Sequence, residues 1–397
     1  MTAQVPYARL SSFYFFHFAT LGGLLPFLAL YLDSMGFSAT QIGQLMALFA
    51  VTKLVAPNVW GWLADRNGGP LSLIRWAGFL TVLCFSTLLF ADGFWAVAGG
   101  VVAFSFFWNA ALPPYEALTL NHLGPHTRYY SLVRLWGSVG FILVAGSFGW
   151  AFDRFSPLWL PMLLLPVFAG IWFSTLLTPD HPLQAADAPH QPLRAVLAHP
   201  SVLGFLAAAF LLHFSHGPYY TFFTLYLEDL GYGRGLIGLF WVVGVVAEIL
   251  LFLVFPRLFQ SYSARHLFLV ALAATAVRWF VTALFADVLL LVFLVQTLHL
   301  ASFGICHVVA MHYVHRFFPG PLQGRGQGLY SSLGFGAGGA LGSFLSGYVW
   351  HWGGGSAIFA MATIAVLAGL IIAWMTLPRR ELPVMLGTSR LTSTASV

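Results

Sequence analysis

The chain has 397 residues, of which 59% are hydrophobic, 17% aromatic and only 7% charged. Soluble domains carry charges on about a quarter of their residues, so the composition excludes an ordinary soluble protein and indicates one embedded in a bilayer. The net charge of +5 does not indicate a nucleic-acid partner, because the basic residues are spread over many short loops. The two cysteines, Cys84 and Cys306, lie within apolar runs, and we read them as packing residues and predict no metal site.

Apolar stretches of about 20 residues, the length with which a helix crosses about 30 Å of hydrocarbon, recur along the whole chain. The predicted membrane-spanning helices cover residues 9–32, 40–64, 72–92, 94–120, 132–153, 157–178, 201–228, 236–258, 267–286, 288–315, 327–350 and 356–377. The prediction is therefore an all-α membrane protein with twelve transmembrane helices.

An internal repeat divides the chain into two equal parts. The segment "YLDSMGFSATQIG" at 31–43 matches "YLEDLGYGRGLIG" at 226–238, with Tyr, Leu, an acid, Gly, an aromatic residue, Ile and Gly at one constant offset. We predict two related six-helix bundles, 1–178 and 201–378, joined by a cytoplasmic linker at 179–200 and followed by a cytoplasmic tail at 379–397. Six plus six helices with a central linker is an architecture of secondary transporters.

The arginines set the expected orientation, because loops that remain in the cytoplasm collect basic residues. Only Arg154 and Arg234 mark one side in this topology, whereas the other loop arginines share the opposite side. Both termini are therefore predicted to be cytoplasmic. The chain opens directly into its first span, without the pattern of a removed signal peptide.

The segment "GWLADRNGG" at 61–69, between the second and third spans, resembles the loop motif of the major facilitator superfamily. The resemblance implies that Gly61 permits close helix packing, and that Asp65 and Arg66 make charge contacts that break and re-form as the two halves rock. The basic residues that usually follow in this motif are absent here.

Five charged residues lie within predicted spans, where an ionisable group costs about 2.5 to 3.5 kcal/mol and is a functional hypothesis by default. They are Lys53, Glu116, Arg134, Glu248 and Arg278. The repeat offset relates Lys53 to Glu248, so we expect these opposite charges at matching positions on either side of a central cavity. The alternative is that each charge only satisfies a neighbour within its own half.

A second group of polar residues follows in the fourth and fifth spans. Asn109 and Glu116 are seven residues apart and share nearly one helix face, and Arg134 follows in "VRLWGSVGF". An arginine there either holds Glu116 or receives a ligand.

This pattern resembles that of lactose permease, and the resemblance implies a ligand-binding role for Glu116 and Arg134. It extends to Glu248, Arg278 and His299, which fall at or near a permease acid, arginine and histidine. There are two departures: the proton-carrying glutamate is replaced by Ser302 and the sugar-stacking tryptophan by Phe141.

A closer resemblance is to the phenylpropionate permeases of the same superfamily, carried by "VRLWGSV" at 133–139, "GVVAE" at 244–248 and further segments in both halves. It implies uptake of an aromatic carboxylate together with protons, in the inner membrane of a bacterium. The predicted substrate-binding residues are Lys53, Asn109, Glu116, Arg134, Phe141 and Arg278, and the predicted proton-coupling residues are Glu116, Glu248 and His299.

The remaining expectations concern partners and rival functions. We expect a small organic anion, protons and the lipid bilayer as partners of a monomeric transporter that has no cofactor. The rival class is a membrane enzyme, and neither a metal-binding histidine motif nor a nucleophile turn is found for it. Within transport, the alternative is a proton-coupled sugar or nucleoside symporter.

Overall fold

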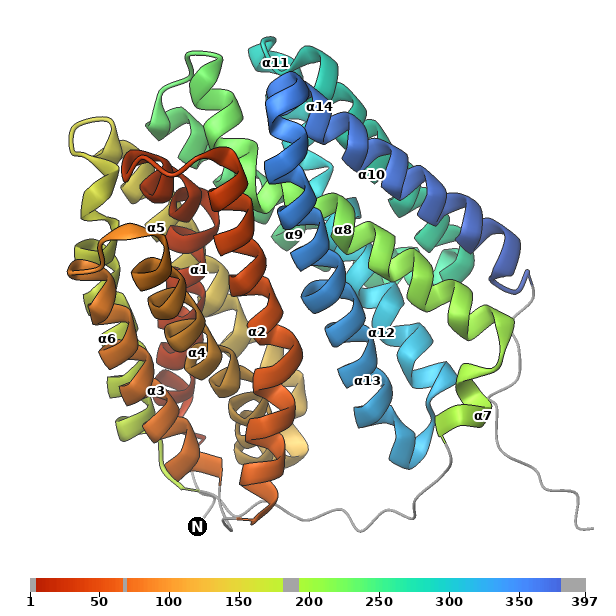
Figure 1. Cartoon of the computed structure of the whole chain (residues 1–397). Coiled ribbons are helices and arrows are strands. Elements are labelled where there is room, and N and C mark those ends of the chain that lie inside the picture. Colours follow the sequence, from red (N-terminus) through yellow and green to blue (C-terminus); the bar gives the residue numbers. More distant parts are fainter. Residues whose placement is uncertain (1–4, 67–69, 181–192, 380–397) are drawn as a thin grey trace, which may run out of the picture.

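The computed structural model describes residues 5–66, 70–180 and 193–379, and the regular secondary structure of these residues is entirely helical (Figure 1). The N-terminal spans are α1 (Tyr7–Ser34), α2 (Ala39–Arg66), α3 (Pro70–Ser86), α4 (Gly93–Leu123), α5 (Tyr130–Phe152) and α6 (Leu160–Leu177). Short 3-10 turns, η1 (Thr87–Leu89), η2 (Gly124–Tyr129) and η3 (Pro157–Trp159), connect some of them.

The C-terminal spans begin after a short helix, α7 (Leu193–Leu197). They are formed by α8 (Pro200–Asp229), α9 (Arg234–Ser261), α10 (Ala264–Phe285), α11 (Leu289–Thr297), η4 (Leu300–Ile305), α12 (Cys306–Phe317), η5 (Gly320–Leu322), α13 (Gln323–Ser331), η6 (Ser332–Gly338) and α14 (Gly339–Thr376). Two of these segments, η4 and η6, are π-helical turns within longer helices. Such turns are rare and occur frequently at functional sites.

Eleven continuous helical stretches in the described chain are long and apolar enough to cross a membrane. The last of them, Gln323–Thr376, contains two spans, because the backbone leaves the helical region at Gly353 and Gly354. Gly354 has φ +56°, a left-handed conformation that suits a residue without a Cβ. The prediction of twelve transmembrane helices is thereby confirmed, and the protein is a multi-pass membrane protein.

The N-terminal and C-terminal spans form two groups that stand side by side (Figure 1). They meet closely at the end of the molecule where α1 turns into α2 and α8 turns into α9, which we call the sealed end. Two seams join the groups there, α2 against α14 and α5 against α9. In the second seam a Cβ on Gly238 would lie 2.6 Å from the carbonyl oxygen of Ala145.

The first seam repeats this packing with the matching residue of the internal repeat. A Cβ on Gly43 would lie 2.8 Å from the carbonyl oxygen of Ser343 and 2.9 Å from Cα of Gly347. The glycine that ends each copy of the repeated motif therefore serves the same purpose in both seams. It lets the helices of the two groups touch without side chains between them.

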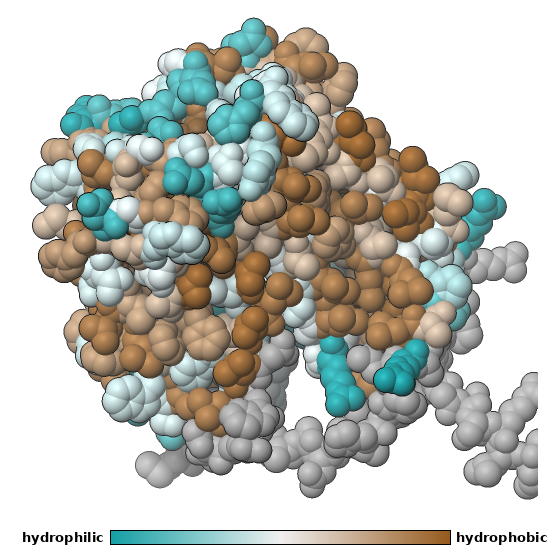
Figure 2. All heavy atoms as spheres, in the orientation of Figure 1, coloured by the Kyte–Doolittle hydropathy of each residue, from teal (hydrophilic) through white to brown (hydrophobic). Residues whose placement is uncertain are grey.

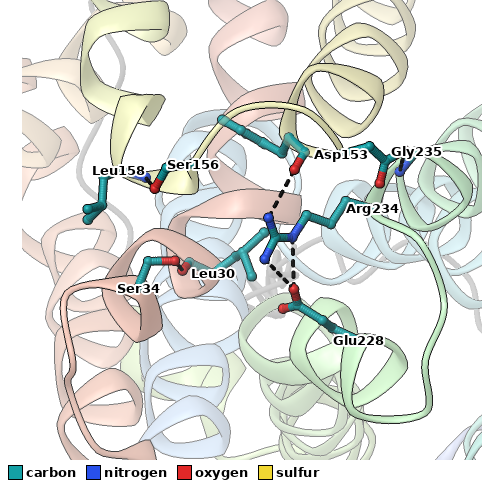
Figure 3. A network of polar contacts seen from close by, with 9 residues as sticks. Leu30, Ser34, Asp153, Ser156, Leu158, Glu228, Arg234 and Gly235 are labelled. Carbon is teal, nitrogen blue, oxygen red and sulfur yellow. Dashed lines mark hydrogen bonds and ion pairs between the residues drawn. The ribbon is translucent and has the colours of Figure 1, made fainter.

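Polar contacts cover the second seam (Figure 3). Arg234 at the start of α9 donates from Nε to Oε1 of Glu228 over 2.8 Å, and from Nη1 to the carbonyl oxygen of Phe152 at the end of α5 over 2.9 Å. The backbone N–H of Gly235 donates to Oδ2 of Asp153 over 3.0 Å. These bonds tie the two groups of spans together at the sealed end.

At the opposite end, where α1 begins, the two groups separate. Figure 2 shows the surface hollowed between them there. We call this the open end.

Candidate functional site

Arg278 on α10 is completely buried and organises the polar cluster of the C-terminal spans. Its Nη1 donates to Oγ of Ser302 over 2.8 Å and lies 3.2 Å from Nδ1 of His299. Its Nη2 donates to Oε1 of Gln296 over 2.9 Å. The guanidinium also lies 4.4 Å from the ring centre of Tyr219, a cation–π contact. Arg278 is thus held by protein groups on several sides.

Glu248 on α9 is paired with His299. Oε2 of Glu248 lies 3.7 Å from Nε2 of the histidine, and the two side chains are only 17% and 10% exposed. Small residues allow this approach, because a Cβ on Gly244 would lie 3.2 Å from Cβ of His299 and one on Gly304 would lie 3.4 Å from Cγ of Glu248. Acid and imidazole together form a site on which a proton can reside.

The N-terminal spans carry the second charged pair, Glu116 on α4 and Arg134 on α5. Nε of Arg134 lies 4.0 Å from Oε1 of Glu116, and both side chains are 33% exposed. The Tyr130 hydroxyl donates to the same carboxylate oxygen over 3.2 Å. The guanidinium lies 3.8 Å from the ring centre of Phe18, which fixes its orientation. This ion pair is long and partly exposed, so its charges remain available to a ligand.

Two further predicted binding residues of the N-terminal spans, Asn109 and Phe141, differ in their surroundings. Nδ2 of Asn109 donates to Oγ1 of Thr52 over 2.9 Å, and this hydroxyl donates in turn to Ser105 over 3.0 Å. Phe141 is buried, and its backbone packs against Gly22 of α1. Asn109 therefore lies in a hydrogen-bonded network, whereas Phe141 takes part in helix packing.

Lys53 on α2 has a different environment from the other charges. Its Nζ lies 5.5 Å from the ring centre of Phe49. Within the described part of the chain, no hydrogen bond or ion pair reaches this ammonium group. An ammonium group at membrane depth without an anion is costly.

The repeat relates Lys53 to Glu248 as matching positions on either side of a central cavity, and among the described residues the two form no ion pair with each other. Glu248 is paired with His299. The Nη donors of Arg278 bond to protein groups, and its role in substrate binding stays a prediction. The predicted loop residues Gly61, Asp65 and Arg66 have side chains outside the described part of the structure, and their role stays a prediction.

Sequence reasoning missed the partners that hold Arg278. Gln296 lies one turn before His299 on the same span and is fully buried, and its Oε1 also accepts from the Tyr219 hydroxyl over 3.1 Å. A single glutamine in an apolar run is the sequence feature that could have indicated this partner of Arg278. It also missed a column of stacked rings in the N-terminal spans, in which buried His17 lies 4.8 Å from Trp108 and 5.5 Å from Phe13, centre to centre.

Two groups of membrane-spanning helices that meet at one end and separate at the other form the architecture of a secondary transporter. The MFS_1-like family model matches residues 7–361, and the chain belongs to this family. Within the described residues, no group of three His, Cys, Asp or Glu side chains is arranged to hold a metal ion.

Relatives extend over nearly the whole chain. The probable 3-phenylpropionic acid transporter of Escherichia coli (strain K12) is 30% identical over 369 residues, which are 89% of this chain and 94% of the relative. The maltose permease of Geobacillus stearothermophilus is 28% identical over 380 residues, 93% of this chain and 94% of the permease. A structure of the nucleoside transporter NupG superposes with a TM-score of 0.82 at 16% identity, covering 93% of this chain and 98% of that one, and shows a shared fold.

Proposed function

We propose that the protein couples the movement of protons to the uptake of a small aromatic carboxylate by alternating access. The observation that carries this proposal is the ammonium group of Lys53, which lies in the interior without an anionic partner among the described residues. Three interior cations, Lys53, Arg134 and Arg278, face two acids, Glu116 and Glu248, and 3 − 2 leaves one positive charge in excess. A carboxylate would neutralise it.

The geometry favours Lys53 and Arg134 as the groups that receive the carboxylate. Arg278 is buried, and both of its terminal nitrogens donate to protein groups. We assign it a positioning role, in which it orients His299 toward Glu248. The name of the relative from Escherichia coli supports an aromatic acid as the substrate.

Proton coupling is assigned to the pair of Glu248 and His299. The carboxylate of Glu248 lies 3.7 Å from the imidazole of His299, so one proton can be held between them. Ser302, at the position of the permease's proton-carrying glutamate, binds Arg278 and carries no titratable group in the physiological range. The open end would face the cytoplasm in the orientation predicted from the arginines.

Uptake into proteoliposomes tests this function. Labelled 3-phenylpropionate should accumulate when a pH gradient is imposed, and maltose and uridine should not. Lys53→Met should raise the KM at least about 10-fold, because a charge-assisted contact of roughly 1.5 kcal/mol or more is lost. Lys53→Arg is the matched control, because it keeps the charge. Accumulation of maltose or uridine alone would instead identify a sugar or nucleoside symporter.

A further inference from the structure

A long groove follows the seam where α2 and α14 run side by side (Figure 1). Its volume is about 670 Å³, within the range of about 300 to 1,000 Å³ that is usual for sites that bind small molecules. Its walls come from α2, the first turn of α4, η6 and α14, and of the described residues that line it all but Gln44 are apolar. We call it the seam groove.

Small and large side chains form different parts of the seam groove. Ala47 on α2 and Ala340 on α14 are buried and form its floor. Val51, Trp95 and Leu341 are exposed and form its rims. Exposed apolar side chains on membrane-spanning helices face lipid, so the groove opens toward the hydrocarbon of the bilayer.

The length of the seam groove matches one leaflet of a bilayer. The groove follows α2 from Gln44 to Leu54, which is 54 − 44 = 10 residues, and at about 1.5 Å per residue this length is about 15 Å. The hydrocarbon of a bilayer is about 30 Å thick, so one leaflet contributes about 15 Å. The groove therefore has the length of one acyl chain in the leaflet at the sealed end.

The end of the groove that is nearest the sealed end has the features of a bilayer surface. Trp95 lies in the first turn of α4 and is 82% exposed, and tryptophans gather where the hydrocarbon meets the lipid headgroups. At the same end, Nε2 of Gln44 donates to the Tyr348 hydroxyl over 3.2 Å. The other end, at Leu54 and Ala337, is apolar. The groove thus has the polarity of a lipid whose headgroup lies at the sealed end.

The walls of the seam groove belong to both groups of spans. α2 and α4 are helices of the first group, and η6 and α14 belong to the second. Ala47 follows Gly43 by one turn of α2, so the floor of the groove continues the contact between Gly43 and Gly347. Separation of the groups at the sealed end would part these walls. A molecule that needs both walls binds better to the sealed conformation and shifts the equilibrium toward it.

We propose that the seam groove holds one acyl chain of a membrane phospholipid from the leaflet at the sealed end, and that this chain stabilises the sealed conformation. The chain gains van der Waals contacts with the floor and rims of the groove. It gains little hydrophobic free energy, because the surrounding hydrocarbon is as apolar as the groove. The inference does not depend on which substrate the protein carries.

Photo-crosslinking in proteoliposomes tests the site on the unmodified protein. Two phosphatidylcholine probes carry a diazirine either near the ester end or at the methyl end of one acyl chain, and mass spectrometry locates the labelled residues. The ester-end probe should label the segments around Gln44 and Trp95, and the methyl-end probe those around Leu54 and Ala337. Labelling should exceed that around Ala360, an exposed residue of α14 outside the groove, by about 5-fold through packing alone.

Two variants separate the groove from the rest of the lipid-facing surface. Ala337→Phe places a ring in the groove and should lower the labelling there about 5-fold, to the level of the surrounding surface. Ala360→Phe is the matched control, because it makes the same change outside the groove and should leave the labelling unchanged. Uniform labelling of the lipid-facing helices by both probes, or groove labelling that persists in Ala337→Phe, would overturn the site. Weaker labelling of the groove than of Ala360 would overturn it as well and would indicate that a protein surface covers it.

Spin labels test the stabilising effect of the chain. Cysteines in place of Phe155 and Asp287, in a protein without Cys84 and Cys306, report the distance across the sealed end from exposed positions outside the groove. Removal of bound lipid in detergent should lengthen this distance, and added phospholipid should restore it. Ala337→Phe carries its own ring in the groove and should not respond to lipid, whereas Ala360→Phe should respond like the unmodified protein. Distances in the unmodified protein that do not depend on phospholipid, or equal responses of the two variants, would overturn the stabilising role.

Discussion

Replacing Gly238 by alanine should shift the protein away from the conformation that is closed at the sealed end. The new Cβ would lie 2.6 Å from the carbonyl oxygen of Ala145, whereas ordinary contact begins at 3.4 Å, so α5 and α9 must separate by 3.4 − 2.6 = 0.8 Å. Overpacking of this kind costs about 1 to 3 kcal/mol. The ratio of sealed to opened molecules should therefore fall by roughly 5-fold to 150-fold.

Distances between two spin labels measure this ratio. Asp92 and Asp287 are exposed, lie at the sealed end in different groups of spans, and can be replaced by cysteine after Cys84 and Cys306 are removed. Gly238→Ala should broaden the distribution toward longer distances, and Gly43→Ala should do the same through the other seam. Gly99→Ala is the control, because nothing lies within 4 Å of its new Cβ. Identical distributions for Gly238→Ala and Gly99→Ala would refute the packing argument.

Three further changes test other parts of the structure. Glu248→Gln should abolish accumulation driven by a pH gradient and retain exchange of labelled for unlabelled substrate; accumulation at the normal level would remove Glu248 from the coupling step. Arg278→Lys should lower the unfolding free energy by about 1 to 3 kcal/mol, because one ammonium group cannot replace both terminal nitrogens of the guanidinium and Gln296 or Ser302 loses its donor. An unchanged melting temperature in detergent would contradict this. Arg234→Gln should lengthen the label distances at the sealed end, since the bond from its guanidinium to the carbonyl oxygen of Phe152 across the seam is lost. A distribution like that of the unmodified protein would show that the glycine seams suffice.

The positions of the spans could be predicted because a polypeptide crosses the hydrocarbon of a bilayer as a long apolar helix, and few other structures satisfy their backbone hydrogen bonds there. The internal repeat could be recognised from the amino-acid sequence alone. The structure shows that the glycines that end its two copies are contact points in the two seams. The rest of the site depended on side-chain directions that no pattern encodes. The repeat relates Lys53 to Glu248 by symmetry, but symmetry-related residues need not touch, and Glu248 is paired with a histidine of its own group.

The two π-helical turns could not be predicted from the sequence. Apart from a single serine in each, η4 and η6 consist of apolar residues and glycines, which transmembrane helices also contain, so the apolar pattern does not reveal the extra residue in the turn. Arg278 illustrates the same limit for a single residue. A buried arginine in an apolar run indicates a polar cluster, but whether the cluster or a ligand satisfies its donors depends on Gln296 and Ser302, which come from another span.

The solitary lysine has a practical consequence. Since Lys53 is the only lysine in the chain, an amine-selective acylating reagent has one side-chain target, and that target lies on α2, the helix that packs against η6 and α14 of the other group. Intact-mass measurement after a brief exposure would count the modified molecules, with the α-amino group as an internal reference. The natural protein thus carries a built-in chemical reporter: the acylation rate would follow how often the interior admits a reagent, without a label or an introduced cysteine.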